Sequence, residues 1–300
     1  MRIVAALGGN ALLKRGEPLE ARTQERNIAA AAKQLATLTD AHELIVTHGN
    51  GPQVGLLALQ SARMENLRPY PLDVLGAETE GMIGYVIERE LRNCRPQREF
   101  ATLLTQTLVD PGDPAFERPT KFVGAVYDDD AAAALGREFG WHFARDGAKL
   151  RRVVPSPKPQ RLFGTEVLRL LVERGVIVVC AGGGGIPVAY ADCGQLIGVE
   201  AVIDKDLASA WIATELAADA LVMLTDVDGV YDDWATAQQR LISQATTAEL
   251  RDRRFAEGSM GPKVEAAIAF AQSGSGFAAI GSLDRVTDLV SGKCGTTIRR

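Results

Sequence analysis

Short apolar runs alternate with amphipathic segments along this chain, and the alternation predicts strands separated by helices. Strands are expected at residues 3–7, 44–47, 102–109, 176–180, 199–203, 220–225 and 277–280. Helices are expected at residues 23–38, after Pro52, and at 72–91, 164–174, from Asp206, and at 262–272, before a closing helix and strand. This order favours βαβ units with right-handed crossovers, and therefore a largely parallel sheet with helices on both faces.

The alternation breaks over residues 110–160. The stretch from Asp110 to Pro114 has the composition of a turn, and three prolines within residues 155–159 make a stiff connection. We interpret residues 110–160 as an insertion or lid on the main sheet. An irregular edge of the core is the alternative interpretation.

Glycine-rich breaks directly follow four of the apolar runs. They are Gly8-Gly9-Asn10, His48-Gly49-Asn50-Gly51, Gly182 to Gly185, and Asp226-Val227-Asp228-Gly229. Glycine lets backbone N–H groups approach an anion closely, and ligands of open α/β sheets sit at the carboxyl ends of the strands. The second break precedes a helix and is the stronger anion site, whereas the first alone is also consistent with a plain turn. The pattern indicates an enzyme that handles phosphorylated small molecules.

The composition of the chain limits the kinds of binding partner and the location that we expect for it. The 300 residues are 46% hydrophobic and 24% charged, with a net charge of −5, which argues weakly against nucleic acid as the main partner. No apolar stretch is long enough to span a membrane, and the four cysteines are scattered, so we expect a cytoplasmic protein with reduced thiols. The three histidines are too dispersed to suggest a histidine-based metal site.

Familiar phosphate and nucleotide motifs are missing from the sequence. The Gly-Lys pair at Gly292-Lys293 is followed by Cys294, so it is no P-loop, and Pro187 interrupts the dinucleotide fingerprint that the four glycines suggest. There is no His-Arg-Asp or Asp-Phe-Gly of protein kinases and no Gly-x-Ser-x-Gly elbow. Any phosphate chemistry must therefore use another scaffold.

Two lysines stand at predicted strand-to-helix junctions. Lys263 lies in the first turn of a predicted helix, where its charge opposes the helix dipole unless a phosphate is bound. Lys205 lies between Asp204 and Asp206, which are placed to orient it. The alternative for Lys263 is a solvated surface lysine, and the alternative for Lys205 is a simple surface ion pair. Asp226 and Asp228 suit a metal, a ribose or a capping role, and the pattern does not decide among these.

Taken together, these residues resemble the amino acid kinase family, and within it the carbamate kinases. The signature Leu224-Thr225-Asp226-Val227-Asp228-Gly229-Val230-Tyr231 resembles the nucleotide lobe of that family. The other matching segments are residues 6–12, 47–55, 119–121, 153–159, 180–187, 200–206 and 258–267, in family order along nearly the whole chain.

The resemblance implies a fold, a reaction and a set of partners. The fold is a three-layer αβα sandwich with a mainly parallel central sheet and a small protruding lid. The reaction is reversible phosphoryl transfer from carbamoyl phosphate to ADP, giving carbamate and ATP with Mg²⁺, without a covalent phosphoenzyme. The implied assembly is a homodimer. Within a single domain of residues 1–300, residues 1–109 and 161–205 form the carbamoyl phosphate lobe, 110–160 the lid and 206–300 the nucleotide lobe.

The resemblance also assigns the site residues. It implies that Lys205 and Lys263 hold the transferring phosphoryl group and the nucleotide phosphates, and that Asp206 orients Lys205. It assigns no metal-ligating residue, because Mg²⁺ is expected mainly on the nucleotide phosphates. The implied carbamoyl phosphate site is lined by Gly8, Gly9, Asn10, Gly49, Asn50 and Gly51. The implied nucleotide site contains Thr225, Asp226, Tyr231, Met260 and Lys263.

One departure within the family is informative. Many amino acid kinases carry a lysine where this chain has Ala6, and carbamate kinases replace it with a lysine from the lid, which here is Lys121. Phe122 follows where proline is expected. Two alternatives remain open, namely another kinase that forms acyl phosphates on amino acid carboxylates, and a catalytically silent sensor of nucleotide or carbamoyl phosphate.

Overall fold

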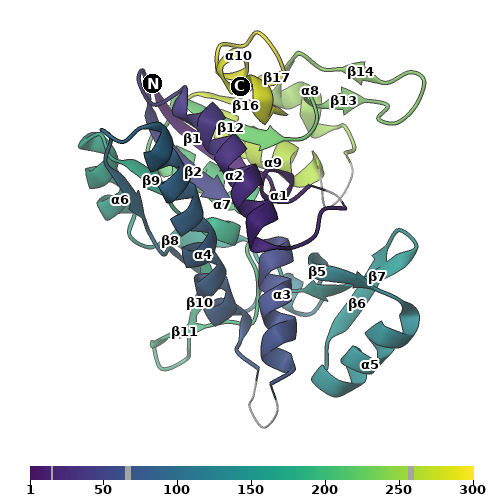
Figure 1. Ribbon diagram of the computed structural model, residues 1–300. Helices are drawn as coiled ribbons and strands as arrows, with labels where there is room; N and C mark the ends of the chain where they lie inside the picture. The colour runs from purple at the N-terminus through teal and green to yellow at the C-terminus, as the bar shows by residue number, and fades with distance from the viewer. Residues whose placement is uncertain (15, 65–68, 256–259) are drawn as a thin grey trace.

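The computed structural model describes residues 1–14, 16–64, 69–255 and 260–300, apart from the side chain of Asn10 (Figure 1). Its helices are α1 (Gly9–Leu12), α2 (Ala21–Ala36), α3 (Gly51–Ala62), α4 (Leu72–Cys94), α5 (Asp129–Phe139), α6 (Thr165–Glu173), α7 (Lys205–Glu215), α8 (Thr247–Arg251), α9 (Met260–Ser273) and α10 (Val286–Val290), with 3₁₀ turns η1 (Pro114–Phe116), η2 (Gly182–Gly184) and η3 (Leu283–Arg285). Its strands are β1 (Arg2–Leu7), β2 (Glu43–His48), β3 (Phe100–Thr102), β4 (Gln106–Val109), β5 (Lys121–Tyr127), β6 (His142–Asp146), β7 (Lys149–Val154), β8 (Pro159–Leu162), β9 (Ile177–Val179), β10 (Ile186–Tyr190), β11 (Leu196–Gly198), β12 (Ala220–Thr225), β13 (Tyr231–Asp232), β14 (Arg240–Leu241), β15 (Gln244–Thr246), β16 (Phe277–Ser282) and β17 (Thr296–Arg299).

The central sheet has β1 in its interior. Within the described residues it has eight strands in the order β15-β17-β16-β12-β1-β2-β9-β3. Among the described residues of this sheet, only the β16–β17 pair is antiparallel, and the other neighbouring strands run parallel. Because β1, β2, β9 and β12 run in the same direction, the glycine-rich breaks that follow them meet at one edge of the sheet.

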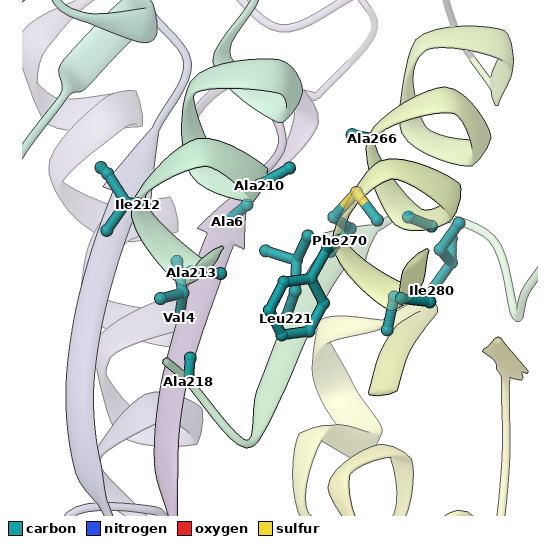
Figure 2. Packing of buried hydrophobic residues seen from close by; sticks show 14 of the residues in the cluster. Val4, Ala6, Ala210, Ile212, Ala213, Ala218, Leu221, Ala266, Phe270 and Ile280 are labelled. Atoms are coloured by element: carbon teal, nitrogen blue, oxygen red, sulfur yellow. The ribbon is translucent and has the colours of Figure 1, made fainter. Parts of the chain in front are cut away.

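Alternate residues of β1 enter two separate cores. Ile3 and Leu7 pack in the core that α2, α4 and α10 cover, whereas Val4 and Ala6 pack in the core that α6, α7 and α9 cover. Figure 2 shows the second core, where Phe270 of α9 lies among small and branched side chains of β1, α7 and β12. Full burial of a phenylalanine contributes about 1.5–3 kcal/mol, so the sheet holds α7 and α9 firmly. The predicted αβα sandwich is confirmed.

A smaller subdomain protrudes beside α3. It contains the sheet β5-β7-β6 together with α5, and β5 packs against α3 (Figure 1). The contact is between backbones, because a methyl group added to Gly55 of α3 would lie 2.0 Å from the Cα of Gly124, which has a φ of +73°. Glycine at both positions is therefore what brings this subdomain close to the main body.

The structure corrects two predicted strands. Residues 102–109 form no single strand, because the chain leaves β3 after Thr102 and enters a second sheet as β4. Residues 199–203 are not a strand but a connection that leads into α7, in which Ala201 and Ile203 are buried. The second sheet, β11-β10-β4-β8, was not predicted. In the described part of the chain, no helix combines the length and apolar character needed to cross a membrane.

Candidate active site

The site begins with a carboxylate that caps a helix. Asp204 is the N-cap of α7, and its Oδ1 accepts hydrogen bonds from the backbone N–H groups of Asp206 and Leu207. Such a cap satisfies N–H groups that have no partner within the helix. It fixes Lys205 and Asp206 in the first turn of α7, at the carboxyl edge of the central sheet.

Asp206 lies between two lysines that come from different helices. Its Oδ1 is 2.5 Å from Nζ of Lys205, and its Oδ2 is 3.1 Å from Nζ of Lys263 in the first turn of α9. Asp206 is only 4% exposed. The structure therefore brings together Lys205, Asp206 and Lys263, although 57 positions separate the second from the third.

The charges of this cluster depend on one another. Burial opposes ionisation of Asp206, but the ammonium groups of Lys205 and Lys263 outweigh it and lower the pKa of this carboxyl. Burial lowers the pKa of Lys205, an effect that Asp206 opposes and Lys263 reinforces. With two cations on one anion, the cluster has a net positive charge and suits a phosphate.

Lys121 connects the protruding subdomain to the same helix start. Its Nζ is 2.5 Å from Oδ2 of Asp204, whose other oxygen caps α7. One carboxylate thus joins β5 to the turn that carries Lys205. The sequence suggested that Asp204 orients Lys205, but in the structure the ion-pair partner of Asp204 is Lys121.

The two glycine loops face each other beside Lys205. Gly49 lies against Gly9 and Lys205, because a methyl group on Gly49 would be 3.4 Å from the N of Gly9 and 3.6 Å from Cδ of Lys205. The N–H of Gly8 donates to Leu224 O, and Gly51 begins α3. Backbone N–H groups at two helix starts therefore adjoin the lysine cluster, as an anion site requires. The side chain of Asn10 lies outside what the structure describes.

Two polar side chains at the end of β2 and in the loop that follows it, His48 and Asn50, face other parts of the protein. The Nδ1 of His48 lies 3.1 Å from Gly49 O, Nε2 lacks a partner among the described residues, and burial lowers the pKa of this histidine to about 4, so it is neutral. Asn50 donates from Nδ2 to Oγ1 of Thr79 in α4 at 2.9 Å. A neutral histidine buried in this way has a structural role in the loop.

The predicted nucleotide residues follow β12 and start α9. Thr225 ends β12 and donates to Asp226 Oδ1 at 3.1 Å. The ring of Tyr231 packs against that of Trp234, with 5.2 Å between centroids. Met260 is the first residue of α9 and packs on the α6–α7–α9 core. Residues 258 and 259 of the matching segment lie outside the described residues.

Comparison with known proteins identifies the family to which this chain belongs. The model of the amino acid kinase family matches residues 1–280. The chain belongs to the amino acid kinase family. Within the family, it is 53% identical to carbamate kinase of Haemophilus influenzae over 301 residues, covering 100% of this chain and 97% of that protein. It is 50% identical to carbamate kinase of Escherichia coli K12, covering 99% and 98%.

Solved structures of the family give the same result. Carbamate kinase from Giardia lamblia bound to AMP-PNP superposes on this amino acid kinase with a TM-score of 0.90 at 38% identity, covering 99% of this chain and 98% of that one. A second structure of the Giardia enzyme, bound to citric acid, gives a TM-score of 0.92 at 39% identity. The family resemblance that the motifs predicted is confirmed.

Sequence reasoning missed one buried group at the edge of this site. Glu80 of α4 is 1% exposed and accepts hydrogen bonds from Thr105 and Gly182. It lies within an ordinary amphipathic helix pattern, and only its contacts with distant loops distinguish it. Among the described residues, no three histidine, cysteine, aspartate or glutamate side chains are grouped closely enough to hold a metal ion.

Proposed function

We propose that this chain is a carbamate kinase that transfers a phosphoryl group reversibly between carbamoyl phosphate and ADP, giving carbamate and ATP. The observation that carries the proposal is Asp206, which holds Lys205 and Lys263 together beside the facing loops of Gly9 and Gly49. Full-length identity of about half to carbamate kinases supports the same reaction.

This chemistry requires alignment and charge neutralisation. The bond from phosphorus to the carbamoyl oxygen breaks, and a bond from phosphorus to an oxygen of the ADP β-phosphate forms. Carbamate departs as a stable anion, and the attacking phosphate oxygen is already ionised, so neither group needs a general acid or base. Two negatively charged reactants repel each other, and fixed cations with backbone N–H groups reduce that repulsion in the transition state.

Each residue of the cluster has a role in the proposal. Lys205 contacts the transferring phosphoryl group, and Lys263 contacts the nucleotide phosphates from the start of α9. Asp206 raises the pKa of Lys205 and holds the ammonium groups of Lys205 and Lys263 in position. Lys121 adds a third cation from the lid. Carbamoyl phosphate is bound by the loops of Gly8, Gly9, Asn10, Gly49, Asn50 and Gly51, and the nucleotide by Thr225, Asp226, Tyr231 and Met260.

In the proposed reaction, Mg²⁺ binds together with the nucleotide. Both oxygens of Asp206 already face ammonium groups, so this carboxylate is not an open metal ligand. Mg²⁺ usually keeps several waters and binds through substrate phosphates, so the proposal places the ion mainly on phosphate oxygens of the nucleotide. Bound there, Mg²⁺ would neutralise charge on the ADP and ATP phosphates.

The homodimer and the cytoplasmic location remain predictions from the sequence. In favour of a dimer, α4 carries Val74, Met82 and Tyr85 as exposed apolar side chains, and exposed Leu196 and Ile197 lie on β11. Such a group of apolar side chains is typical of an association surface. Sedimentation equilibrium would give twice the mass of 32.1 kDa for a dimer.

A substrate panel tests the proposed function. ATP formation is measured with MgADP and, in turn, carbamoyl phosphate, acetyl phosphate, aspartyl phosphate and N-acetylglutamyl phosphate. We expect turnover with carbamoyl phosphate at least a hundredfold above that with the amino acid acyl phosphates. Preference for an amino acid acyl phosphate would establish the rival kinase, and binding of carbamoyl phosphate without turnover would establish a sensor.

A further inference from the structure

Two consecutive polar residues of α4 are buried beneath the substrate loops. Thr79 is 0% and Glu80 is 1% exposed, although both lie inside a helix whose buried face is otherwise mostly apolar. A buried carboxyl group is costly unless its oxygens are hydrogen-bonded. Among the described residues, no lysine, arginine or histidine is within ion-pair distance of Glu80. Its partners are instead backbone N–H groups of two loops.

Glu80 ties together the loops that follow β3 and β9. Its Oε1 accepts from the N–H of Gly182 at 2.8 Å, and its Oε2 accepts from the N–H of Thr105 at 3.1 Å. The two loops are also joined directly, because the N–H of Ala181 donates to Oγ1 of Thr105 at 3.0 Å. One side chain therefore fixes the spacing between α4, the β3–β4 connection and the turn η2.

Thr79 extends the same arrangement to the loop after β2. Its Oγ1 accepts from Nδ2 of Asn50, and its own hydroxyl has carbonyl acceptors one turn earlier in α4. The Asn50 amide in turn lies against η2, since a methyl group on Gly183 would be 2.2 Å from its Nδ2. A methyl group on Gly182 would be 2.3 Å from Cε1 of His48. These loops are packed without room to shift independently.

We propose that Thr79 and Glu80 are positioning residues that set the affinity for carbamoyl phosphate by holding the loop of Gly49 and Asn50 against η2. The inference rests on the proposed function. Gly49 lies close to both Gly9 and Lys205, since a methyl group on it would contact each of them, so displacement of Asn50 moves backbone N–H groups relative to the lysine cluster. The nucleotide residues after β12 and in α9 make none of these contacts, so binding of ADP is unaffected.

The test uses two variants with matched controls. Glu80→Gln retains the shape but places an NH₂ group against a backbone N–H, and Thr79→Val removes the acceptor for Asn50. Thr79→Ser retains the hydroxyl. Glu88→Gln alters another α4 carboxylate, which accepts from Oγ1 of Thr102 at the end of β3, at 2.7 Å, rather than from the loop that follows β3. KM for carbamoyl phosphate and for MgADP is measured for each protein by coupled ATP formation.

We expect KM for carbamoyl phosphate to rise at least tenfold in Glu80→Gln and Thr79→Val, with KM for MgADP within twofold of the original protein. Thr79→Ser and Glu88→Gln should keep both values. Unchanged KM for carbamoyl phosphate, or an equal rise of both KM values, would overturn the inference. If Glu80→Gln does not fold, the pair of Thr79 variants decides. Absence of turnover in the original protein would overturn the proposed function and the inference together.

Discussion

Asp206→Asn removes one charge from between two ammonium groups and leaves the shape of the side chain nearly unchanged. Oδ1 and Oδ2 of Asp206 lie 2.5 and 3.1 Å from Nζ of Lys205 and Lys263. In the variant, an NH₂ group faces one of these cations and the neutral oxygen faces the other. The two ammonium groups then repel each other without a shared counter-ion, and both lysines lose their fixed position.

The magnitude follows from the hydrogen bonds that are lost. A hydrogen bond to a charged group contributes about 1.5–3 kcal/mol, so disturbing two of them costs roughly 3 kcal/mol or more. If that loss falls on the transition state, turnover decreases at least ~100-fold, because 1.36 kcal/mol corresponds to a factor of ten. The Asp206 charge also raises the pKa of Lys205 against burial and Lys263. In the variant, this pKa therefore falls further.

The assay is the dependence of kcat on pH, with carbamoyl phosphate and MgADP saturating. Protonated Lys205 is the active form, so activity is lost as pH rises through its pKa, and this alkaline decrease should move to lower pH in Asp206→Asn. Asp40→Asn, which alters an exposed ion pair with Arg95, is the matched control. Turnover within tenfold of the original protein, with an unshifted alkaline decrease and an intact fold by circular dichroism, would refute the reasoning.

Three further predictions concern the lid and the buried carboxyl group. Lys121→Ala should lower kcat at least tenfold and leave ADP affinity by calorimetry unchanged; a large loss of ADP binding would contradict its place in the lid. Gly55→Ala should lower kcat although alanine favours a helix, because its methyl group would displace the lid at a cost of about 1–3 kcal/mol; normal turnover and melting temperature would contradict this. Burial raises the pKa of Glu80 from 4.5 to about 8, so its stabilising contribution is complete below pH 4.5 and is lost as pH rises through 8. The free energy of unfolding, measured by urea titration, should therefore decrease less between pH 5 and pH 9 in Glu80→Gln than in the original protein. An equal decrease in both proteins would contradict the assignment. The nearby His48 and Cys180 stay neutral over this range and do not contribute to the difference.

The strand and helix order was predictable because it depends on local patterns. Alternation of apolar runs and amphipathic segments predicted β1, β2, β9, β12, β16 and the closing strand of the central sheet, but not β15 at Gln244–Thr246. Residues 102–109 were read as one strand because nothing in their composition marks the point where the chain passes from one sheet to another. The connection at residues 199–203 is largely apolar because Ala201 and Ile203 are buried before α7, and a partly buried connection can have the same composition as a strand.

The site was predictable in part. The glycine loops follow strands, so their meeting at one edge follows from a parallel sheet. The partners of each lysine did not follow, because Lys121 pairs with Asp204 across 83 positions and only the folded chain defines that distance. The role of Glu80 was hidden for a related reason. Its partners are backbone N–H groups, which every residue except proline possesses, so no sequence pattern marks them.

The most direct test of the central claim is coupled formation of ATP from carbamoyl phosphate and MgADP by the original protein and by variants of its lysines. We expect robust ATP formation that falls at least ~100-fold, about 3 kcal/mol in transition-state stabilisation, in Lys205→Ala and in Lys263→Ala. Lys158→Ala, which removes an exposed lysine paired with Glu265, should behave as the original protein does. Near-normal kcat in well-folded Lys205→Ala, or no ATP formation by the original protein across a range of pH and Mg²⁺ concentration, would contradict the account.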